Sequence, residues 1–234
     1  MNDDELLRIG ADTSFTYDTR GRMLLSNEPR VQERRPAPRL VLGWTTTAYV
    51  LRLSATVPDD LAQRLSEIIE RQPPAGDLRT TPAASVALRA ALEAHAPITG
   101  ERRGPAYRFP ASIGPLGDAI RITASNRQIA RDTFPWLYDE YAGWRPCFAV
   151  VRDGAAVSVC FSSRIGTRAC AAGVETLPEF RGHGYAAAVT AAWGTAVRQA
   201  GLLPLYSTAW DNLASQAVAG KLGLTMFAAN VSWA

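Results

Sequence analysis

The stretch Val174-Glu-Thr-Leu-Pro-Glu-Phe-Arg-Gly-His-Gly-Tyr-Ala186 decides how the rest of this sequence is interpreted. It predicts a strand that ends just before Pro178, because proline cannot continue the hydrogen bonding of a strand. Gly182 and Gly184 then open a long helix, and their lack of a Cβ atom lets the backbone approach a bulky group. Free N–H groups at the positive end of that helix would hold an anion such as a pyrophosphate, with Arg181 as an added cation. The alternative is a tight strand–helix turn with a charged cap.

The residues around that stretch predict a mixed order of strands and helices. Asp153-Gly154 between two apolar runs is a strong β-hairpin signal, and Gly201 marks the end of the long helix. The expected elements are strands at 120–123, 147–152, 156–163, 168–176, 203–208 and 224–233, and helices at 125–141, 182–200 and 212–222. This order is not the strict strand–helix alternation that builds a doubly wound sheet.

The first part of the chain shows local order but no chemical signature. The expected elements there are strands at 40–44 and 48–53, a helix from Asp59 to about residue 71, and a helix from Thr81-Pro82 to about residue 94. The polar, Arg- and Pro-rich residues 10–38 are expected to be loop-like.

A domain boundary is predicted near residue 110. Segments 99–105 and 113–117 are both rich in turn formers. The predicted division is an N-terminal segment, 1–110, and a core, 111–234.

Composition excludes several classes of protein. The 234 residues are 47% hydrophobic and 20% charged, which suits a globular chain with a packed core. Lys+Arg 25 against Asp+Glu 22 gives a net charge of +3, and the charges are evenly spread, so neither nucleic acid nor a membrane surface is an expected partner. No apolar run is long enough to cross a bilayer, and the acidic first residues show no secretory signal.

The cysteines bear on metal binding and compartment. Cys147, Cys160 and Cys170 form no Cys-x-x-Cys pair, and the sequence has only two histidines. No zinc site of standard spacing can be drawn, so no metal is expected. Three cysteines that cannot all pair favour a reducing compartment, so the expected localisation is cytoplasmic.

A dinucleotide site is one alternative for the glycine loop. Residues 182–187 fit the pattern Gly-x-Gly-x-x-[Gly/Ala] only with Ala187 in its third conserved place. Such a fingerprint belongs in a first β-α unit with an acid about 20 residues further on, and here only about 47 residues follow. The next predicted strand ends in Ser207-Thr208 without an acid. A nicotinamide or flavin site is therefore not favoured.

The same residues resemble the pyrophosphate loop of the GNAT superfamily of acyl-CoA N-acyltransferases, [Arg/Gln]-x-x-Gly-x-[Gly/Ala]. Arg181-Gly-His-Gly-Tyr-Ala186 follows a strand ending in Gly173-Val-Glu-Thr176. Independently, Leu205-Tyr-Ser-Thr-Ala-Trp-Asp-Asn212, Ala214-Ser215 and Lys221-Leu-Gly-Leu224 are similar to the family's strand, Asn-initiated helix and terminal Lys-Leu-Gly-Phe segment. The resemblance covers about residues 118–234. It implies a GNAT-type α/β fold, with a mixed, mostly antiparallel twisted sheet flanked by helices and an extra N-terminal α/β segment.

The resemblance also implies a binding gap for acetyl-CoA, where strands 168–176 and 203–208 splay apart. Backbone groups of the first strand would pair with the pantetheine arm, and amides of the glycine loop would hold the pyrophosphate. The cofactor-binding residues implied are Val174, Thr176, Arg181, Gly182, His183, Gly184, Tyr185, Ala186, Ala187, Asn212 and Ser215. Two have structural alternatives: Asn212 as a helix cap and His183 as a solvent-facing residue.

The reaction implied is direct attack of a neutral amine on the thioester. Glu175 is the carboxylate in the predicted gap and the candidate catalytic base; the alternative is a solvated glutamate. The family often has a tyrosine seven residues after the asparagine as general acid, and this chain has Ala219 there. Tyr206, Ser207, Ser215 or a water would have to replace it.

The expected function is therefore transfer of an acetyl group from acetyl-CoA to a primary amine, with a small molecule as the expected acceptor and a peptide or protein amine left open. The alternative is a non-catalytic acyl-CoA-binding or partner-binding module, which Ala219 favours. Residues 1–110 have three open interpretations: a degenerate copy of the same fold, a lid, or a dimerisation element that would make a homodimer.

Overall fold

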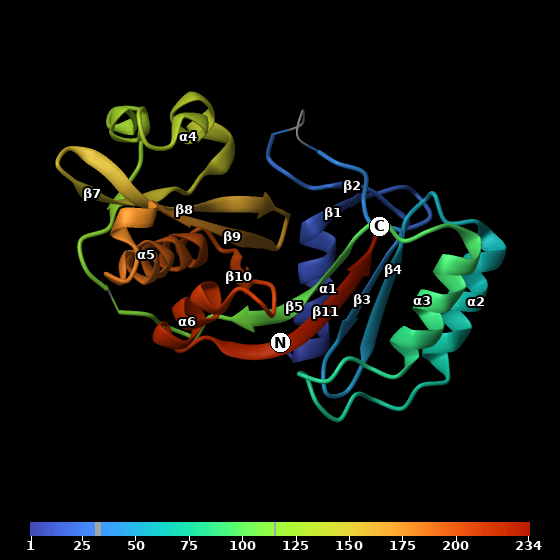
Figure 1. Ribbon diagram of the computed structural model, residues 1–234. Helices are drawn as coiled ribbons and strands as arrows, with labels where there is room; N and C mark the ends of the chain where they lie inside the picture. The colour runs from blue at the N-terminus through green and yellow to red at the C-terminus, as the bar shows by residue number, and fades with distance from the viewer. Residues whose placement is uncertain (31–33, 115) are drawn as a thin grey trace.

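The computed structural model describes residues 1–30, 34–114 and 116–234 (Figure 1). Within these residues a nine-stranded sheet has the order β4-β3-β11-β5-β10-β9-β8-β7-β6, and β1 pairs with β2 in a separate sheet. The strands are β1 Phe15–Tyr17, β2 Met23–Ser26, β3 Leu40–Trp44, β4 Tyr49–Leu53, β5 Glu101–Arg108, β6 Ile120–Arg121, β7 Phe148–Arg152, β8 Ala155–Ile165, β9 Ala169–Thr176, β10 Leu203–Ser207 and β11 Thr225–Trp233. The helices are α1 Asp3–Ser14, α2 Asp59–Glu70, α3 Ala84–His95, α4 Pro135–Glu140, α5 Tyr185–Gln199 and α6 Leu213–Lys221, with short 3₁₀ helices η2 Arg127–Ala130, η3 Tyr141–Trp144 and η4 Pro178–Phe180.

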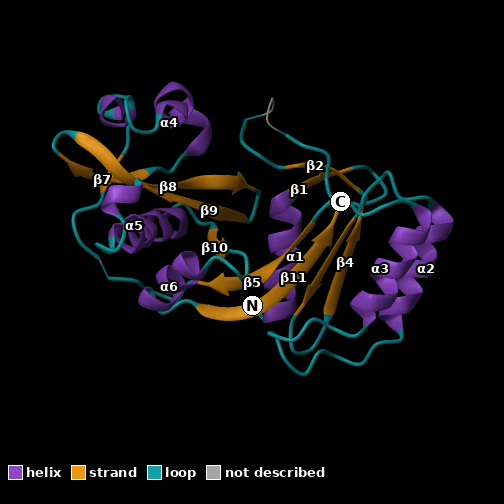
Figure 2. Ribbon diagram, viewed as in Figure 1, coloured by secondary structure: helices purple, strands orange, loops and turns teal. Residues whose placement is uncertain are grey.

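The large sheet is mixed and mostly antiparallel, as the sequence predicted. Its neighbouring strands are antiparallel except β9 and β10, which are parallel. Helices α5 and α6 lie over one end of the sheet and α2 and α3 over the other, while α1 lies against the middle strands (Figure 2). The expected hairpin is confirmed: Asp153 and Gly154 both adopt positive φ, 50° and 80°, between β7 and β8.

Burial of apolar side chains holds the helices on the sheet. In α2, Leu61 and Leu65 lie one turn apart and share a buried cluster with Leu40 and Leu42 of β3. In α5, Trp193 is fully buried, and its Nε1 donates a hydrogen bond to Ser162 Oγ of β8 at 3.1 Å. Each fully buried side chain of this size contributes about 1.5–3 kcal/mol.

The expectation of turns at 99–105 is wrong for most of that segment, because β5 begins at Glu101. Gly104 permits the strand here: a Cβ atom at this position would collide with the carbonyl oxygen of Thr208. Two hydrogen bonds hold the approaching backbone, from Thr208 N to Pro105 O and from Trp210 N to Arg103 O, both 3.2 Å. The glycine that indicated a turn serves a close backbone approach instead.

The prediction of a loop over residues 10–38 is also wrong in part, because α1 extends to Ser14 and is followed by β1 and β2. Asn2 caps α1 by accepting a hydrogen bond from Glu5 N at 2.8 Å. The side chains of Leu6 and Ile9 are buried under the sheet. The helix expected over 125–141 is likewise interrupted, as η2 and then α4, which begins at Pro135.

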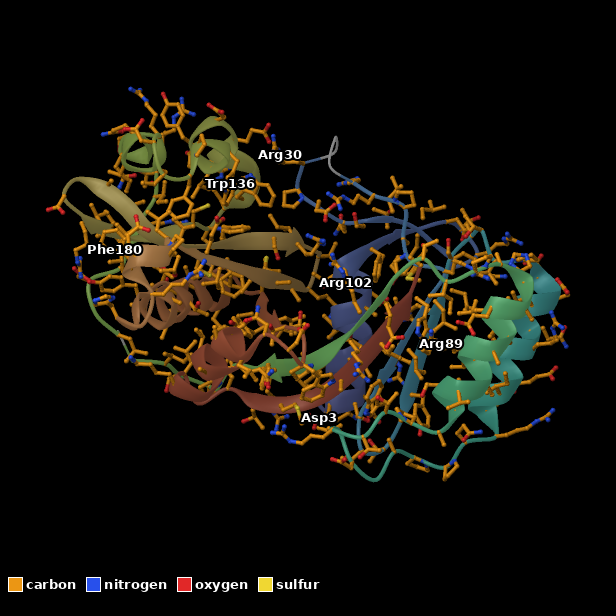
Figure 3. The ribbon with its side chains drawn as sticks, viewed as in Figure 1. Asp3, Arg30, Arg89, Arg102, Trp136 and Phe180 are labelled. Carbon is orange, nitrogen blue, oxygen red and sulfur yellow. The ribbon has the colours of Figure 1, made fainter. Side chains whose placement is uncertain are left out.

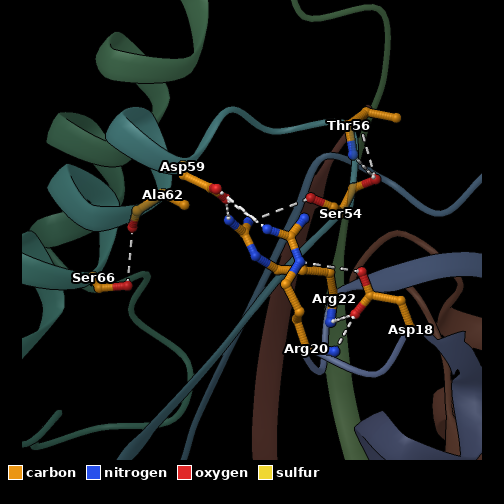
Figure 4. A network of polar contacts seen from close by, with 8 residues as sticks. All are labelled: Asp18, Arg20, Arg22, Ser54, Thr56, Asp59, Ala62 and Ser66. Atoms are coloured by element: carbon orange, nitrogen blue, oxygen red, sulfur yellow. Dashed lines mark hydrogen bonds and ion pairs between the residues drawn. The ribbon is translucent and has the colours of Figure 1, made fainter.

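The β1–β2 turn is tied to α2 by charged side chains (Figure 4). Arg20 and Arg22 both pair with Asp59 at the start of α2, at 3.2 and 2.8 Å. Asp18 accepts hydrogen bonds from the backbone amides of Arg22 and Arg20, which hold the pKa of its carboxyl below the ordinary value. The polar character of this segment therefore reflects a network that orders the turn.

The predicted boundary near residue 110 falls in a chain whose large sheet is continuous. Strand β5, from before the boundary, lies between β10 and β11, both from after it. Strand β11 also pairs with β3 over Ala229–Trp233. The two parts therefore interleave their strands in one sheet. Their division into separate domains, 1–110 and 111–234, stays a prediction.

Candidate functional site

The two parallel strands of the sheet separate partway along their length. β9 and β10 pair at Leu203↔Ala169, Pro204↔Cys170 and Leu205↔Ala171, and no further. Beyond that point β9 continues along β8 to Thr176, whereas Tyr206 and Ser207 of β10 pair with β5. The resemblance implied such a divergence, and it leaves the edge of residues 172–176 that is not paired with β8 without a strand partner.

Strand alternation sorts the side chains at this gap to opposite faces. Val174 packs against the cluster that α5 buries. Thr176 Oγ1 lies 2.7 Å from Ser158 Oγ of β8, and either hydroxyl can be the donor. Glu175, between them, is exposed on the other face, and among the described residues its carboxylate has no hydrogen bond or ion pair.

An aromatic cluster lies on the face that Glu175 shares. Trp136, Trp144 and Phe161 pack edge to face, with ring centroids 4.7–5.4 Å apart (Trp136 is labelled in Figure 3). Phe161 is paired with Gly173, where any Cβ atom would overlap the Phe161 ring. The candidate base therefore stands at the edge of an apolar wall.

The glycine loop has the conformation that the two glycines suggested. Gly182 and Gly184 have φ of 82° and 81°, in the left-handed region that favours glycine, and Gly184 is the N-cap of α5. The first amide with a described acceptor is Ala188 N, which donates to Gly184 O at 3.2 Å. The backbone amides of residues 182–187 thus have no acceptor within the described part of the chain. They form a row of unpaired donors at the positive end of a helix.

Aromatic and basic side chains surround this row of donors. His183 Nδ1 lies 2.9 Å from Arg181 O, and the imidazole stacks on Tyr185 with centroids 5.4 Å apart. Arg181 Nε donates to Thr176 O at 3.3 Å. Arg152 Nε donates to Tyr185 OH at 3.1 Å, and the guanidinium also pairs with Asp118. The tyrosine of the loop is therefore braced on both sides.

Lys221 is a site residue that the sequence reasoning did not assign. It is the chain's one lysine, in the last turn of α6, and its Nζ lies 2.5 Å from where a Cβ atom of Gly184 would be. Its ammonium has no hydrogen bond or ion pair with any residue that the structure describes. The available signal was a lone lysine in an arginine-rich chain.

The start of α6 carries the other predicted residues. Asn212 Oδ1 accepts a hydrogen bond from Ser215 N at 3.0 Å, so the side chain acts as a helix cap, the structural alternative. Ser215 Oγ lies 2.6 Å from Tyr206 OH. Burial raises the pKa of Tyr206 to about 12. Ala219 is fully buried in the core.

Three further observations concern metal ligands, thiols and membrane-spanning helices. No group of three or more His, Cys, Asp or Glu side chains in residues 1–30, 34–114 and 116–234 is arranged to hold a metal ion. Cys147, Cys160 and Cys170 are buried free thiols, and burial raises the pKa of Cys147 to about 12. None of the helices in the described part of the chain is long and apolar enough to cross a membrane.

Comparison with known proteins gives one family match. Residues 138–228 match the family model described as GNAT acetyltransferase. No curated protein matches the chain.

Among solved structures, the chain is similar to a GCN5-related N-acetyltransferase-like protein from Streptococcus suis, at 16% identity, TM-score 0.49 and 99% coverage of both chains. It is similar to an acetyltransferase of the GNAT family from Colwellia psychrerythraea, at 14% identity and TM-score 0.49, over 79% of this chain and 75% of that one. A GCN5-related N-acetyltransferase from Kribbella flavida is 19% identical at TM-score 0.44, over 87% and 90% of the two chains.

Proposed function

Because residues 138–228 match the family model described as GNAT acetyltransferase, we propose that this chain transfers an acetyl group from acetyl-CoA to a primary amine by direct attack. The main observation in support of this proposal is the row of backbone amides at residues 182–187. These donors face outward at the positive end of α5, beside the point where β9 and β10 separate. A pyrophosphate would satisfy several of them at once.

The gap between β9 and β10 would take the pantetheine arm. Val174 and Thr176 would offer their backbone groups as an unpaired strand edge, and the glycine loop would hold the phosphates. Arg181, His183 and Tyr185 line the rim of the loop, and Ala186 and Ala187 supply the next amides of α5. Bound acetyl-CoA supplies an activated thioester carbonyl, which a strand amide near Val174 would polarise.

The acceptor amine would approach from the face that carries Glu175. As the amine attacks, a bond forms between its nitrogen and the acetyl carbon, and the carbon–sulfur bond breaks with its electron pair leaving on the CoA sulfur. The proton that the amine loses goes to the Glu175 carboxylate or to water. The exposure of Glu175 suits this, because its carboxylate is open to an approaching amine and to water. The apolar wall of Trp136, Trp144 and Phe161 would bound the acceptor's path.

We further propose a small molecule as the acceptor, and the cytoplasm as the compartment, since the three buried thiols are unpaired. A homodimer formed through the N-terminal segment remains part of this proposal. Neither nucleic acid nor a membrane is proposed as a partner, because the net charge of +3 is small and spread over the sequence.

Thermal unfolding with acetyl-CoA, CoA, NAD or buffer alone tests the binding step. A ligand at about 100 times its dissociation constant stabilises the folded state by about 2.7 kcal/mol, a rise in Tm of roughly 5–10 °C for a chain of this size. The expected result is a rise with both CoA species and none with NAD. No rise with either CoA species would overturn the proposal.

The second candidate function is a non-catalytic acyl-CoA-binding module, which the buried Ala219 favours. Release of CoA thiol, followed with a thiol reagent over a broad panel of amines, separates the two. A transferase releases thiol with at least one amine, whereas a binding module shows the rise in Tm and no release.

A further inference from the structure

We propose that Ser215 is a catalytic residue that donates a hydrogen bond to the departing CoA sulfur, and that Tyr206 is a positioning residue that holds the Ser215 hydroxyl in that orientation. The inference rests on the proposed function and assigns the leaving-group contact that Ala219 cannot make. It begins from the 2.6 Å contact between Tyr206 OH and Ser215 Oγ, which joins β10 to α6.

The pair lies where the parallel strands part. Leu205 is the last residue of β10 that pairs with β9, and Tyr206 is the next one along. The Tyr206 side chain is 4% exposed and shares a cluster with Val174 of β9. Ser215 is in the first turn of α6 and only partly buried. A thioester held at Val174 would therefore have this hydroxyl pair on the β10 side of the gap.

The two contacts allow two hydrogen-bond arrangements. A phenol has one proton to donate, and Tyr206 OH has Ser215 Oγ at 2.6 Å and Ser215 O at 3.2 Å in reach, while Ser215 can itself be the donor in the 2.6 Å contact. In the arrangement that we propose for the reaction, Tyr206 donates to Oγ and the serine's own hydrogen is free. Asn212 fixes the same residue from the other side, because its Oδ1 accepts Ser215 N at 3.0 Å.

The pair acts by hydrogen bonding and not as a relay of protons. Burial raises the pKa of Tyr206 to about 12, whereas the pKa of an ordinary thiol is about 8.5. The phenol is therefore too weak an acid to protonate the departing thiolate. It stays neutral through the physiological range and keeps its donor proton for Ser215.

The electrons and protons of the step balance without another reactant. The amine nitrogen forms a bond to the acetyl carbon, the carbon–sulfur bond breaks, and its electron pair stays on sulfur. The Ser215 hydroxyl stabilises this thiolate by a charge-assisted hydrogen bond. The amine's proton goes to Glu175 or water, and solvent protonates the thiolate after release.

The test is steady-state and single-turnover kinetics of wild type, Ser215→Ala, Ser215→Thr and Tyr206→Phe. Loss of one charge-assisted donor predicts that Ser215→Ala lowers kcat about 10- to 100-fold, with KM for acetyl-CoA changed less than about 2-fold if the contact forms only as the bond breaks. Ser215→Thr keeps a hydroxyl and is expected to restore most of the rate. Tyr206→Phe is expected to lower kcat less, and the double variant to match Ser215→Ala.

The matched control is Ser66→Ala, which removes a hydroxyl of α2 whose acceptor is Ala62 O and is expected to leave kcat unchanged. The rise in Tm with CoA confirms folding and binding of each variant. If wild type turns over and Ser215→Ala keeps its kcat, this inference is wrong and the proposed function stands. If wild type releases no CoA thiol with any amine, the proposed function and this inference both fall.

Discussion

The ammonium of Lys221 stands at the mouth of the glycine loop, 2.5 Å from where a Cβ atom of Gly184 would lie. The two residues come from the end of α6 and the start of α5. A cation beside a helix N-terminus is repelled by the helix dipole unless an anion lies between them. The contact therefore places the positive charge of Lys221 where a phosphate of the proposed ligand would neutralise both groups.

We expect Lys221→Met to weaken CoA binding about 10-fold, because a hydrogen bond to a charged group contributes about 1.5–3 kcal/mol. Lys221→Arg, which keeps the charge, is expected to retain most of the affinity. Isothermal titration at two salt concentrations measures this, and the salt dependence of binding should be smaller for the methionine variant.

Arg64→Met is the matched control, since Arg64 is an exposed cation on α2 whose partner is Asp60. It is expected to leave CoA affinity unchanged. Equal affinity of Lys221→Met and wild type would show that the lysine only lies near the loop.

A second expectation concerns the loop itself. Gly184→Asp puts a carboxylate among the outward-facing amides and beside Lys221, so it should occupy the cradle as an internal anion and abolish the rise in Tm with CoA. Gly201→Asp is the matched control, because Gly201 has a similar φ of 76° at the other end of α5, with open space around it. The two variants carry the same backbone strain. Persistent CoA binding by Gly184→Asp, with the chain folded, would place the phosphate site elsewhere.

The sequence predicted most C-terminal elements, because the residues that determine them lie next to one another in the chain. The pair Asp153-Gly154 favours a turn, and two glycines with positive φ shape the loop before α5. Neither feature depends on residues that are distant in the chain. The sequence did not predict β5, because Gly104 matters only through Thr208, which is distant in the chain. The approach of Lys221 to Gly184 and that of Tyr206 to Ser215 were missed for the same reason: each needs two elements placed in space.

The interleaved strands lead to an expectation about folding. A fragment of residues 111–234 lacks β5 and so leaves β10 and β11 without the strand that lies between them. Unpaired backbone groups at both exposed edges are costly and favour aggregation. We expect this fragment to show no cooperative thermal transition by circular dichroism, whereas the full chain does.

Co-expression of residues 1–110 as a separate polypeptide is the control, since it returns β5 in trans. A soluble complex with a cooperative transition would support the role given to β5. Cooperative unfolding of 111–234 alone would instead establish that the C-terminal part is an independent domain.

The last expectation is a loss of stability at alkaline pH. Burial raises the pKa of Cys147 from 9.0 to about 12 and that of Tyr206 from 10.0 to about 12. Both groups are neutral in the folded and unfolded chains below about pH 8.5, so they make no pH-dependent contribution there. Above the unfolded pKa values only the unfolded chain ionises. The free energy of unfolding should therefore fall as the pH rises from about 9 towards 12.

Denaturant unfolding at pH 8, 9.5 and 11 measures this fall, and Cys147→Ala should reduce the slope between pH 9 and 11 because it removes one of the groups whose pKa burial raises. A thiol reagent at pH 8 provides an independent check. The buried thiols should react only after denaturation, since the thiolate is the reactive form. Fast labelling of the native chain would contradict the burial on which the argument depends, whereas slow labelling at the rate of unfolding would agree with it.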